Sequence, residues 1–264
     1  MDSADFDHAA KTYDLQFSQT GIGLAQRAQV WRNIQSVIDK SECPSILEIN
    51  CGTGDDAFRW SQNHSQVLST DISPQMVSLA KSKYPTLSFE VLDARKLNNL
   101  STKYDIIFSN FGGLNCLSPQ EIKDFFTNAN KRLNDGGRLI MVIMGKKCIW
   151  DRFYQRLKGQ KKNVNRRNTT SSLDVYVDGE NIATWYYSPR ELNQLAGHDY
   201  KNQRIAPIGL FVPPSYLAPF FKGKQFLLEI LKVLDRLIPF GSLSNYADHY
   251  FVSLVKSDSK KAAL

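Results

Sequence analysis

The chain has 264 residues, 42% of them hydrophobic and 22% charged, and a formal net charge of +7. This length and hydrophobic content can bury the core of one α/β domain with an added element, and two full domains are not expected. No stretch approaches the roughly 18 apolar residues of a membrane-spanning helix, and the acidic first residues lack the apolar core of a signal peptide, so we expect a cytoplasmic protein.

The cysteines do not form a recognisable metal motif. Cys43, Cys51, Cys116 and Cys148 contain no CxxC pair and have no neighbouring histidine. We therefore expect reduced, partly buried thiols, and the sequence suggests no metal site.

The first forty residues are predicted to be helical, because apolar residues recur near helical spacing on both sides of Gly21 and Gly23. Before these glycines stand Phe6, Ala9, Ala10, Tyr13 and Phe17, and after them Leu24, Ala28, Trp31, Ile34 and Ile38. These helices precede the first predicted strand.

Residues 46–57 are predicted to form a strand, a tight turn and the start of a helix. An apolar run that includes Glu48 leads into Gly52 and Gly54, and Asp55 and Asp56 open the next segment. The two glycines allow close approach of the backbone to a ligand. Such a turn suits a dinucleotide or S-adenosylmethionine, and glycine spacing alone does not choose between them.

Charge favours S-adenosylmethionine. A dinucleotide places its pyrophosphate on the first turn of the helix, where Asp55 and Asp56 would repel it. S-adenosylmethionine instead carries a sulfonium and an ammonium group, which suit Glu48, Asp55 and Asp56. The alternative interpretation is that the two aspartates only stabilise the start of the helix.

Two further predicted strands also end in an acidic residue, at Asp71 and at Asp93. A carboxylate at the position of Asp71 can accept hydrogen bonds from both hydroxyl groups of a ribose. Ile72 and Met76 would cover an adenine ring, although Met76 could equally belong to the core of a helix. Taken alone, Asp93 would be a helix cap or a turn former.

The remaining predicted elements complete an α/β pattern. A fourth strand begins at residue 104 and runs into a glycine-containing loop that includes Asn110. A helix is predicted at residues 119–133. A turn at 134–137 then leads into a fifth strand at 138–144. Residues 148–157 are predicted to be helical, and two β-like runs at 173–177 and 182–187 flank a turn, which together indicate an inserted cap. A capping box at Ser188 and Glu191 starts the next helix.

The C-terminal part supplies the last strands. Residues 199–212 contain a sixth strand, residues 216–238 an apolar helix, and residues 246–255 a seventh strand that we expect to pair antiparallel at the edge of the sheet.

Residues 46–144 resemble the class I S-adenosylmethionine-dependent methyltransferases. Their first motif, acid-x-Gly-x-Gly-x-Gly, is matched by Glu48, Gly52 and Gly54, while Asn50 replaces the first glycine. Asn tolerates unusual backbone dihedrals better than most residues. The stretch from Ala9 to Asp14 also resembles the Ala-x-x-Tyr-Asp pattern of the small-molecule members of this group.

The resemblance implies a fold and a set of boundaries. The fold is α/β, with a Rossmann-like seven-stranded mostly parallel sheet, helices on both faces, an N-terminal helical lid and an inserted cap after the fifth strand. The implied parts are the lid (1–40), the S-adenosylmethionine-binding core (41–145), the substrate cap (146–198), the C-terminal part of the core sheet (199–256) and a tail (257–264).

The resemblance also implies cofactor contacts for S-adenosyl-L-methionine. Tyr13 would contact its carboxylate, Asp71 its ribose and Asp93 its adenine amino group, while the backbone N–H of Ala94 would meet a ring nitrogen. The complete set of expected cofactor-binding residues is Tyr13, Glu48, Asn50, Cys51, Gly52, Gly54, Asp71, Ile72, Met76, Asp93, Ala94 and Asn110.

The expected acceptor is a small hydrophobic molecule such as a phenol, quinone, lipid or specialised metabolite. The loop after the fourth strand lacks the Asn/Asp-Pro-Pro-Tyr/Phe motif of many enzymes that methylate exocyclic amines, and the cap region is rich in aromatic residues, although these could also be core. They are Trp150, Phe153, Tyr154, Trp185, Tyr186, Tyr187, Phe211 and Tyr216. No specific nucleic acid is expected as a partner, and peripheral membrane contact is left open.

Two other functions stay open at this point. An RNA or protein methyltransferase would use the acid-free basic stretch at 158–167, which otherwise reads as a solvated loop. A NAD(P)-dependent oxidoreductase would use the same glycine turn. The four histidines, His8, His64, His198 and His249, are candidate bases, but the sequence places none of them in a site, and no catalytic residue is assigned.

Overall fold

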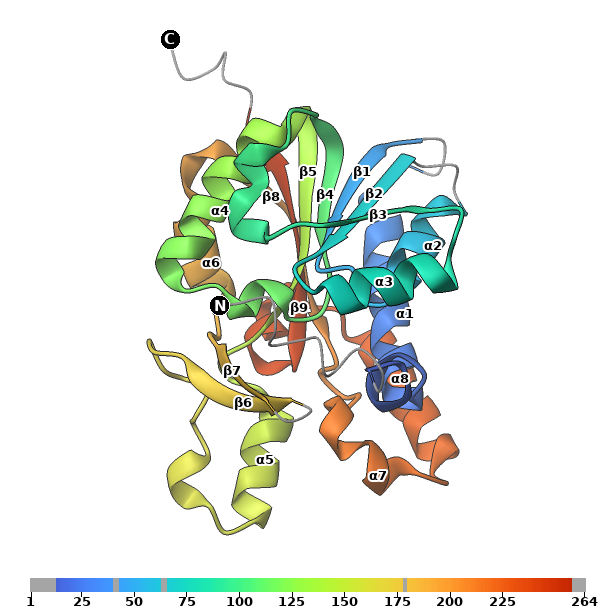
Figure 1. Ribbon diagram of the computed structural model, residues 1–264. Helices are drawn as coiled ribbons and strands as arrows, with labels where there is room; N and C mark the ends of the chain where they lie inside the picture. The colour runs from blue at the N-terminus through green and yellow to red at the C-terminus, as the bar shows by residue number, and fades with distance from the viewer. Residues whose placement is uncertain (1–12, 40–42, 63–65, 178–179, 258–264) are drawn as a thin grey trace.

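The computed structural model describes residues 13–39, 43–62, 66–177 and 180–257. Its centre is a seven-stranded sheet in the order β3-β2-β1-β4-β5-β9-β8, with helices on both faces (Figure 1). Strands β1 to β5 are parallel, and β9 is antiparallel to both of its neighbours. The predicted Rossmann-like fold is confirmed. The strands are β1 (Ser45–Ile49), β2 (Gln66–Asp71), β3 (Ser88–Val91), β4 (Tyr104–Ser109), β5 (Leu133–Met144), β8 (Tyr200–Ile208) and β9 (His249–Lys256).

The place of the last strand differs from the prediction. Strand β9 does not lie at the edge of the sheet: it lies between β5 and β8, and β8 forms the edge. The reason lies in the two burial patterns. Residues 249–254 of β9 are buried without interruption, whereas β8 exposes Lys201, Asn202 and Gln203. A strand with continuous burial needs cover on both faces, and an edge position suits the polar one.

The two faces of the sheet bury separate cores. On one face, α1 (Gly21–Gln35) and α2 (Asp55–Ser61) pack Val30, Trp31 and Trp60 against Ile106 and neighbouring strand residues. On the other, α4 (Pro119–Arg132) and α6 (Pro189–Ala196) cover Ile107 and the residues beside it. Adjacent residues of one strand thus serve opposite cores, as the period of two requires. Helix α3 (Pro74–Lys83) covers Phe89 of β3 in a smaller cluster.

The segment after β5 forms the predicted insertion. It contains α5 (Ile149–Leu157) and a hairpin of β6 (Leu173–Val177) with β7 (Glu180–Thr184). Both lie beyond one end of the sheet, at the bottom of Figure 1. The first two residues of the predicted turn, Asp178 and Gly179, lie outside the described residues. The predicted capping box of α6, formed by Ser188 and Glu191, is confirmed.

The apolar helix predicted at 216–238 is broken. The structure has α7 (Ala218–Phe221) and α8 (Gln225–Leu237), separated by Gly223 with a left-handed φ of 79°. Strand β5 starts earlier than predicted: residues 134–137, which were expected to form a turn, are part of the strand. The remaining elements are a π-helical turn at Asp14–Ser18 and 3-10 helices at Ala94–Asn99, Gly113–Cys116, Lys161–Asn163, Gly197–Asp199, Ser215–Leu217 and Gly241–Tyr246.

The first twelve residues lie outside the described part of the chain, and with them the first half of the Ala-x-x-Tyr-Asp pattern and His8; His64 also lies outside it. Among the helices that the structure describes, none is long and apolar enough to cross a membrane.

Candidate active site

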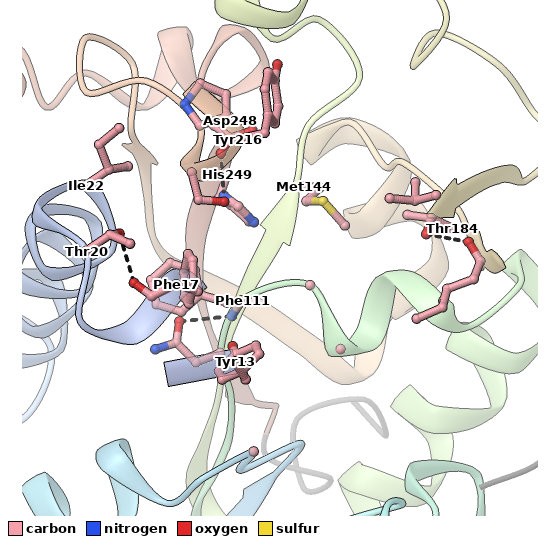
Figure 2. A pocket seen from close by; sticks show the side chains of 18 of the residues that line it. Tyr13, Phe17, Thr20, Ile22, Phe111, Met144, Thr184, Tyr216, Asp248 and His249 are labelled. Carbon is pink, nitrogen blue, oxygen red and sulfur yellow. Dashed lines mark hydrogen bonds and ion pairs between the residues drawn. The ribbon is translucent and has the colours of Figure 1, made fainter. Parts of the chain in front are cut away.

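A cavity of about 1660 Å³ opens at the carboxyl ends of the parallel strands. Its wall includes Asn50 after β1, Asp71 at the end of β2, Asn110 after β4 and Met144 at the end of β5. This is the crevice in which open α/β sheets bind their ligands. Figure 2 shows Tyr13, Phe111 and His249 around this space. Because a pocket for one small ligand usually measures roughly 300–1,000 Å³, this larger cavity has room for a cofactor and a second molecule.

The glycine turn has the geometry that its sequence predicts. Gly54 caps α2 with a left-handed φ of 86°, and a Cβ at this position would lie 2.9 Å from Cζ of Phe89. Gly52 has a φ of 53°, and the Tyr13 ring lies 3.8 Å from the place of its missing Cβ. Position 54 therefore requires glycine for backbone and packing reasons together, whereas at position 52 the positive φ favours glycine and the space would admit a Cβ.

Asn50 takes the conformation of the glycine that it replaces. Its φ is 60°, and its Nδ2 donates to Oγ of Ser109 over 3.1 Å. The amide lies above Gly113, where a Cβ would come within 2.5 Å of Cβ of Asn50. The departure from the motif is thus accommodated by a glycine in a distant loop.

Asp71 connects the turn to the end of β2. Its Oδ2 accepts from the backbone N–H of Gly52 over 2.8 Å, and its Oδ1 accepts from that of Ser73 over 3.0 Å. The carboxylate lies in the cavity wall. A carboxylate offers about four acceptor positions, so these bonds orient it and are compatible with ribose hydroxyls as further donors.

Asp93 is paired with Arg95, a cavity residue that the sequence analysis did not identify. Asp93 Oδ2 lies 2.7 Å from Nη2 of Arg95, and its Oδ1 accepts from the backbone N–H of the same residue over 2.9 Å. Burial would raise the pKa of Asp93, but the hydrogen bonds from Arg95 outweigh it and hold the pKa below its usual value. The carboxyl is therefore an ionised acceptor at neutral pH.

Tyr13 lies over the glycine turn. Burial raises the pKa of its phenol to about 12, against an opposing effect of Arg27. Its ring contacts Phe17 with centroids 5.7 Å apart, and Phe17 contacts Phe111 at 4.9 Å. The hydroxyl is therefore protonated at neutral pH and can donate a hydrogen bond into the cavity.

Most of the expected cofactor residues line this one cavity, and three do not. Those in its wall are Tyr13, Asn50, Gly52, Asp71, Ile72, Met76, Asp93, Ala94 and Asn110. Glu48, Cys51 and Gly54 lie behind the wall. Glu48 accepts from Oγ of Ser69 over 2.6 Å, and burial raises the pKa of its carboxyl well above the usual value. It supports the turn from inside the core.

Asp55 and Asp56 do not face the cavity, so the expected attraction of a cationic ligand by these two residues is wrong. Asp56 is buried and accepts from Arg27, from Nε1 of Trp31 over 2.7 Å and from Nδ2 of Asn110 over 2.8 Å. Asp55 is neutralised by Lys83. Their partners come from other elements, and the alternative role at the start of a helix fits them better.

The opposite wall of the cavity contains His249, which the sequence analysis placed in no site. It stands at the start of β9 and packs edge-on against Phe111, with ring centroids 5.5 Å apart (Figure 2). Its Nδ1 lies 3.2 Å from Oδ2 of the buried Asp248. Asp248 Oδ1 lies 3.1 Å from Nη1 of Arg167. Burial would raise the pKa of Asp248, but His249 and Arg167 hold it well below its usual value.

The basic stretch is not the uniformly solvated loop that the sequence allows. Arg167 is buried between Asp151 and Asp248, and Arg166 pairs with Asp151 at 2.6 Å; both arginines line the cavity. Lys158, Lys161 and Lys162 are exposed. Both arginines thus belong to the site wall and are engaged by acids, but only Arg167 is buried, while Arg166 stays exposed.

The aromatic cap contributes less to the cavity than its sequence suggests. Only Tyr186 and Tyr216 of the predicted cluster line it. Trp185 packs against the core, and the Tyr187 hydroxyl donates to the Leu117 carbonyl over 2.5 Å. Further apolar side chains of the wall come from several elements and include Leu15, Phe17, Ile22, Phe111, Met144, Val175, Tyr176, Ile182 and Phe221.

Residues 46–137 match a family model described as a methyltransferase domain. The chain is 26% identical over 257 residues to the ubiquinone/menaquinone biosynthesis C-methyltransferase UbiE of Campylobacter jejuni, with 94% of each chain covered. It is 27% identical over 110 residues to the demethylmenaquinone methyltransferase of Chlorobaculum parvum, a match of 40% of this chain and 46% of that protein. The chain therefore spans about half the length of the latter relative.

Solved structures share the fold at low sequence identity. A putative S-adenosylmethionine-dependent methyltransferase from Listeria monocytogenes matches with a TM-score of 0.59 and 14% identity, covering 88% of this chain and 100% of that one. The magnesium protoporphyrin IX methyltransferase of Synechocystis PCC 6803, with bound S-adenosylhomocysteine, matches with a TM-score of 0.58 and 13% identity, covering 89% and 85%. The domain model, the relatives and the shared fold agree in one respect: each is similar to, or a member of, the S-adenosylmethionine-dependent methyltransferases, and residues 46–137 of this chain match the methyltransferase domain itself.

Proposed function

We propose that this protein transfers a methyl group from S-adenosylmethionine to a small hydrophobic acceptor, with phenols and reduced quinones as the first class to test. One observation carries the proposal: a single cavity extends from the acids at the strand ends to a wall of aromatic and aliphatic side chains. The Campylobacter relative, named for a quinone C-methyltransferase activity, supports this class of acceptor.

The polar part of the cavity fits the cofactor. Asp71 would accept from the ribose hydroxyls, Asp93 and the backbone of Ala94 would meet the adenine, and the protonated Tyr13 hydroxyl would donate to the carboxylate. Ile72 and Met76 supply apolar cover for the base. Bound S-adenosylmethionine supplies a methyl group that its sulfonium already activates.

The task of the protein is then to exclude water and to hold the acceptor atom in line with the methyl group. The apolar wall around Phe111 and Tyr216 serves this purpose. Phe111 follows Asn110 directly, so the cofactor part and the acceptor part of the cavity meet at this loop.

We assign the removal of the acceptor proton to His249. A hydroxyl or an acidic carbon must lose a proton when it attacks the methyl carbon: the new bond forms to that carbon, the sulfur–carbon bond breaks, and the proton passes to the imidazole. Asp248, 3.2 Å from Nδ1, stabilises the imidazolium that results, and Arg167 holds Asp248 from behind. Nε2 is then the atom that accepts the proton.

The experiment is a methyl-transfer assay with S-adenosylmethionine that carries a labelled methyl group. The panel contains phenols, hydroquinones with a short isoprenoid chain, total RNA and a mixture of unfolded proteins. We expect label in the small aromatic acceptors, with a mass gain of one methyl group. The enzyme used must be shown to bind S-adenosylhomocysteine. If the label then enters only RNA or protein, the proposed acceptor class is overturned.

A further inference from the structure

Helix α8 presents an apolar stripe to solvent. Phe226, Ile230, Val233 and Leu237 recur at the spacing of one helix face, and each side chain is between 42% and 81% exposed. Such a stripe normally packs against a core. Here it lies on the outer surface of the molecule.

The orientation of α8 is fixed from its other face. The buried carboxylate of Asp235 accepts from the backbone N–H groups of Leu210, Phe211 and Val212 over 2.9 to 3.1 Å, and from Nε2 of Gln29 over 2.7 Å. Leu228, on the same side of the helix, is buried in a cluster with α1. Rotating the helix to bury the stripe would expose the Asp235 carboxylate and Leu228. The packing of this inner face therefore keeps the stripe facing outward.

Helix α5 has a similar stripe and lies nearby. Ile149, Phe153 and Leu157 follow one another at intervals of four residues and are 40% to 70% exposed. Trp150 of the same helix contacts the Phe221 ring of α7, with centroids 6.3 Å apart. Figure 1 shows α5, α7 and α8 together at the end of the molecule below the sheet. We call their exposed apolar residues, with Phe220 of α7, the apolar rim.

Basic residues flank the apolar rim. Lys222 and Lys224 lie between α7 and α8, and Lys158, Lys161 and Lys162 follow α5; all five are exposed. The acid nearest to them along α5, Asp151, is buried and engaged by Arg166. Exposed apolar side chains with lysines around them match the boundary between the acyl chains and the anionic headgroups of a bilayer.

We infer that the apolar rim and its lysines dock the protein onto an anionic lipid bilayer. The cavity wall reaches the same region, because Pro219, Phe221, Lys222 and Gly223 also line the cavity. A lipophilic molecule dissolved in the bilayer would therefore meet the cavity at the docked face. Docking itself does not depend on the proposed methyl transfer; only this route of entry rests on it.

The test is flotation of the whole protein with vesicles of phosphatidylcholine alone and of phosphatidylcholine mixed with phosphatidylglycerol. We expect binding to the anionic vesicles that weakens with salt and is much weaker on the neutral ones. The double change Ile230→Glu/Val233→Glu should lower the affinity at least about tenfold, because each side chain loses its burial in lipid. Lys161→Gln and Lys224→Gln should each cost about fivefold.

Controls separate docking from folding and from the proposed function. Leu79→Glu changes an exposed leucine on α3, outside the rim and the cavity wall, and should leave vesicle binding unchanged. All variants should keep the affinity of the parent for S-adenosylhomocysteine. Equal vesicle affinities of parent and Ile230→Glu/Val233→Glu would overturn the inference. A dimer that this double change dissociates, without vesicle binding by the parent, would also overturn it and assign the rim to a second copy of the chain.

Discussion

Asn50 fills the space that any side chain at position 113 would need: a Cβ built on Gly113 would lie 2.5 Å from the Cβ of Asn50. The two residues lie in the loops that follow β1 and β4, which are neighbouring parallel strands. Asn50 replaces a glycine of the motif, and Gly113 leaves the space that the Asn50 side chain occupies. The two residues therefore depend on each other, and both line the cavity.

Because Asn50 and Gly113 share one space, substitutions at the two positions should have non-additive effects on stability. Gly113→Ala should destabilise the fold by about 1–3 kcal/mol through overpacking, and should weaken binding of S-adenosylhomocysteine. Asn50→Gly in the same chain should recover most of the loss, since glycine accepts the φ of 60° and removes the clash. Chemical denaturation of the single and double variants measures the coupling. Strictly additive effects would refute it.

Tyr13 should act as a neutral donor. Tyr13→Phe should weaken binding of S-adenosylhomocysteine about tenfold or more, the size of a lost hydrogen bond to a charged group. Because burial raises the pKa of Tyr13 to about 12, the ratio of parent to variant affinity should be constant from about pH 7 to about pH 9. Titration calorimetry gives both values. A ratio that collapses within this range would show that the phenol ionises there.

Asp248 should contribute to stability in a pH-dependent way. Its folded pKa lies below the unfolded value of about 3.9, so its contribution is complete above that value and is lost as the pH falls through the folded pKa. Asp248→Asn should cost about 1–3 kcal/mol at neutral pH, because buried Arg167 would lose its nearer carboxylate and keep only Asp151, 3.7 Å from its Nε. The difference between parent and variant should shrink in acid. A difference that is the same at neutral and acidic pH would contradict the pairing.

His249 should affect turnover and leave cofactor binding intact. With an identified acceptor, His249→Asn should lower kcat about hundredfold or more, the usual contribution of a general base. Binding of S-adenosylhomocysteine should not change. The groups that face this histidine are Asp248, with Arg167 behind it, and the ring of Phe111. An unchanged kcat would remove His249 from the mechanism.

Local patterns in the sequence were enough to predict the turn and the ends of the strands. Gly52, Gly54 and the capping box at Ser188 depend on residues within a few positions of each other, so spacing reveals them. The position of β9 depends instead on burial of both its faces, which is settled only when the sheet is assembled.

Pairing between distant segments was not predictable. Asp56 looks like a free acid at a helix start, but Arg27 of α1 neutralises it, and Arg167 looks like part of a solvated loop, but it reaches Asp248 across the fold. His249 carries no motif; its role follows from the strand that brings it to Phe111. A signal was nevertheless present in the adjacency of Asp248 and His249, an acid next to a base at the start of a predicted strand.

Calorimetric titration with S-adenosylhomocysteine and with NADH tests whether the cavity binds S-adenosylmethionine. Glu90 is an exposed acid outside the cavity wall, so Glu90→Ala should bind S-adenosylhomocysteine as tightly as the parent. Asp71→Ala should bind it much more weakly. NADH should give no heat with the parent. Circular dichroism shows whether Asp71→Ala keeps its fold. Binding of NADH by the parent, with no response to S-adenosylhomocysteine, would contradict the account.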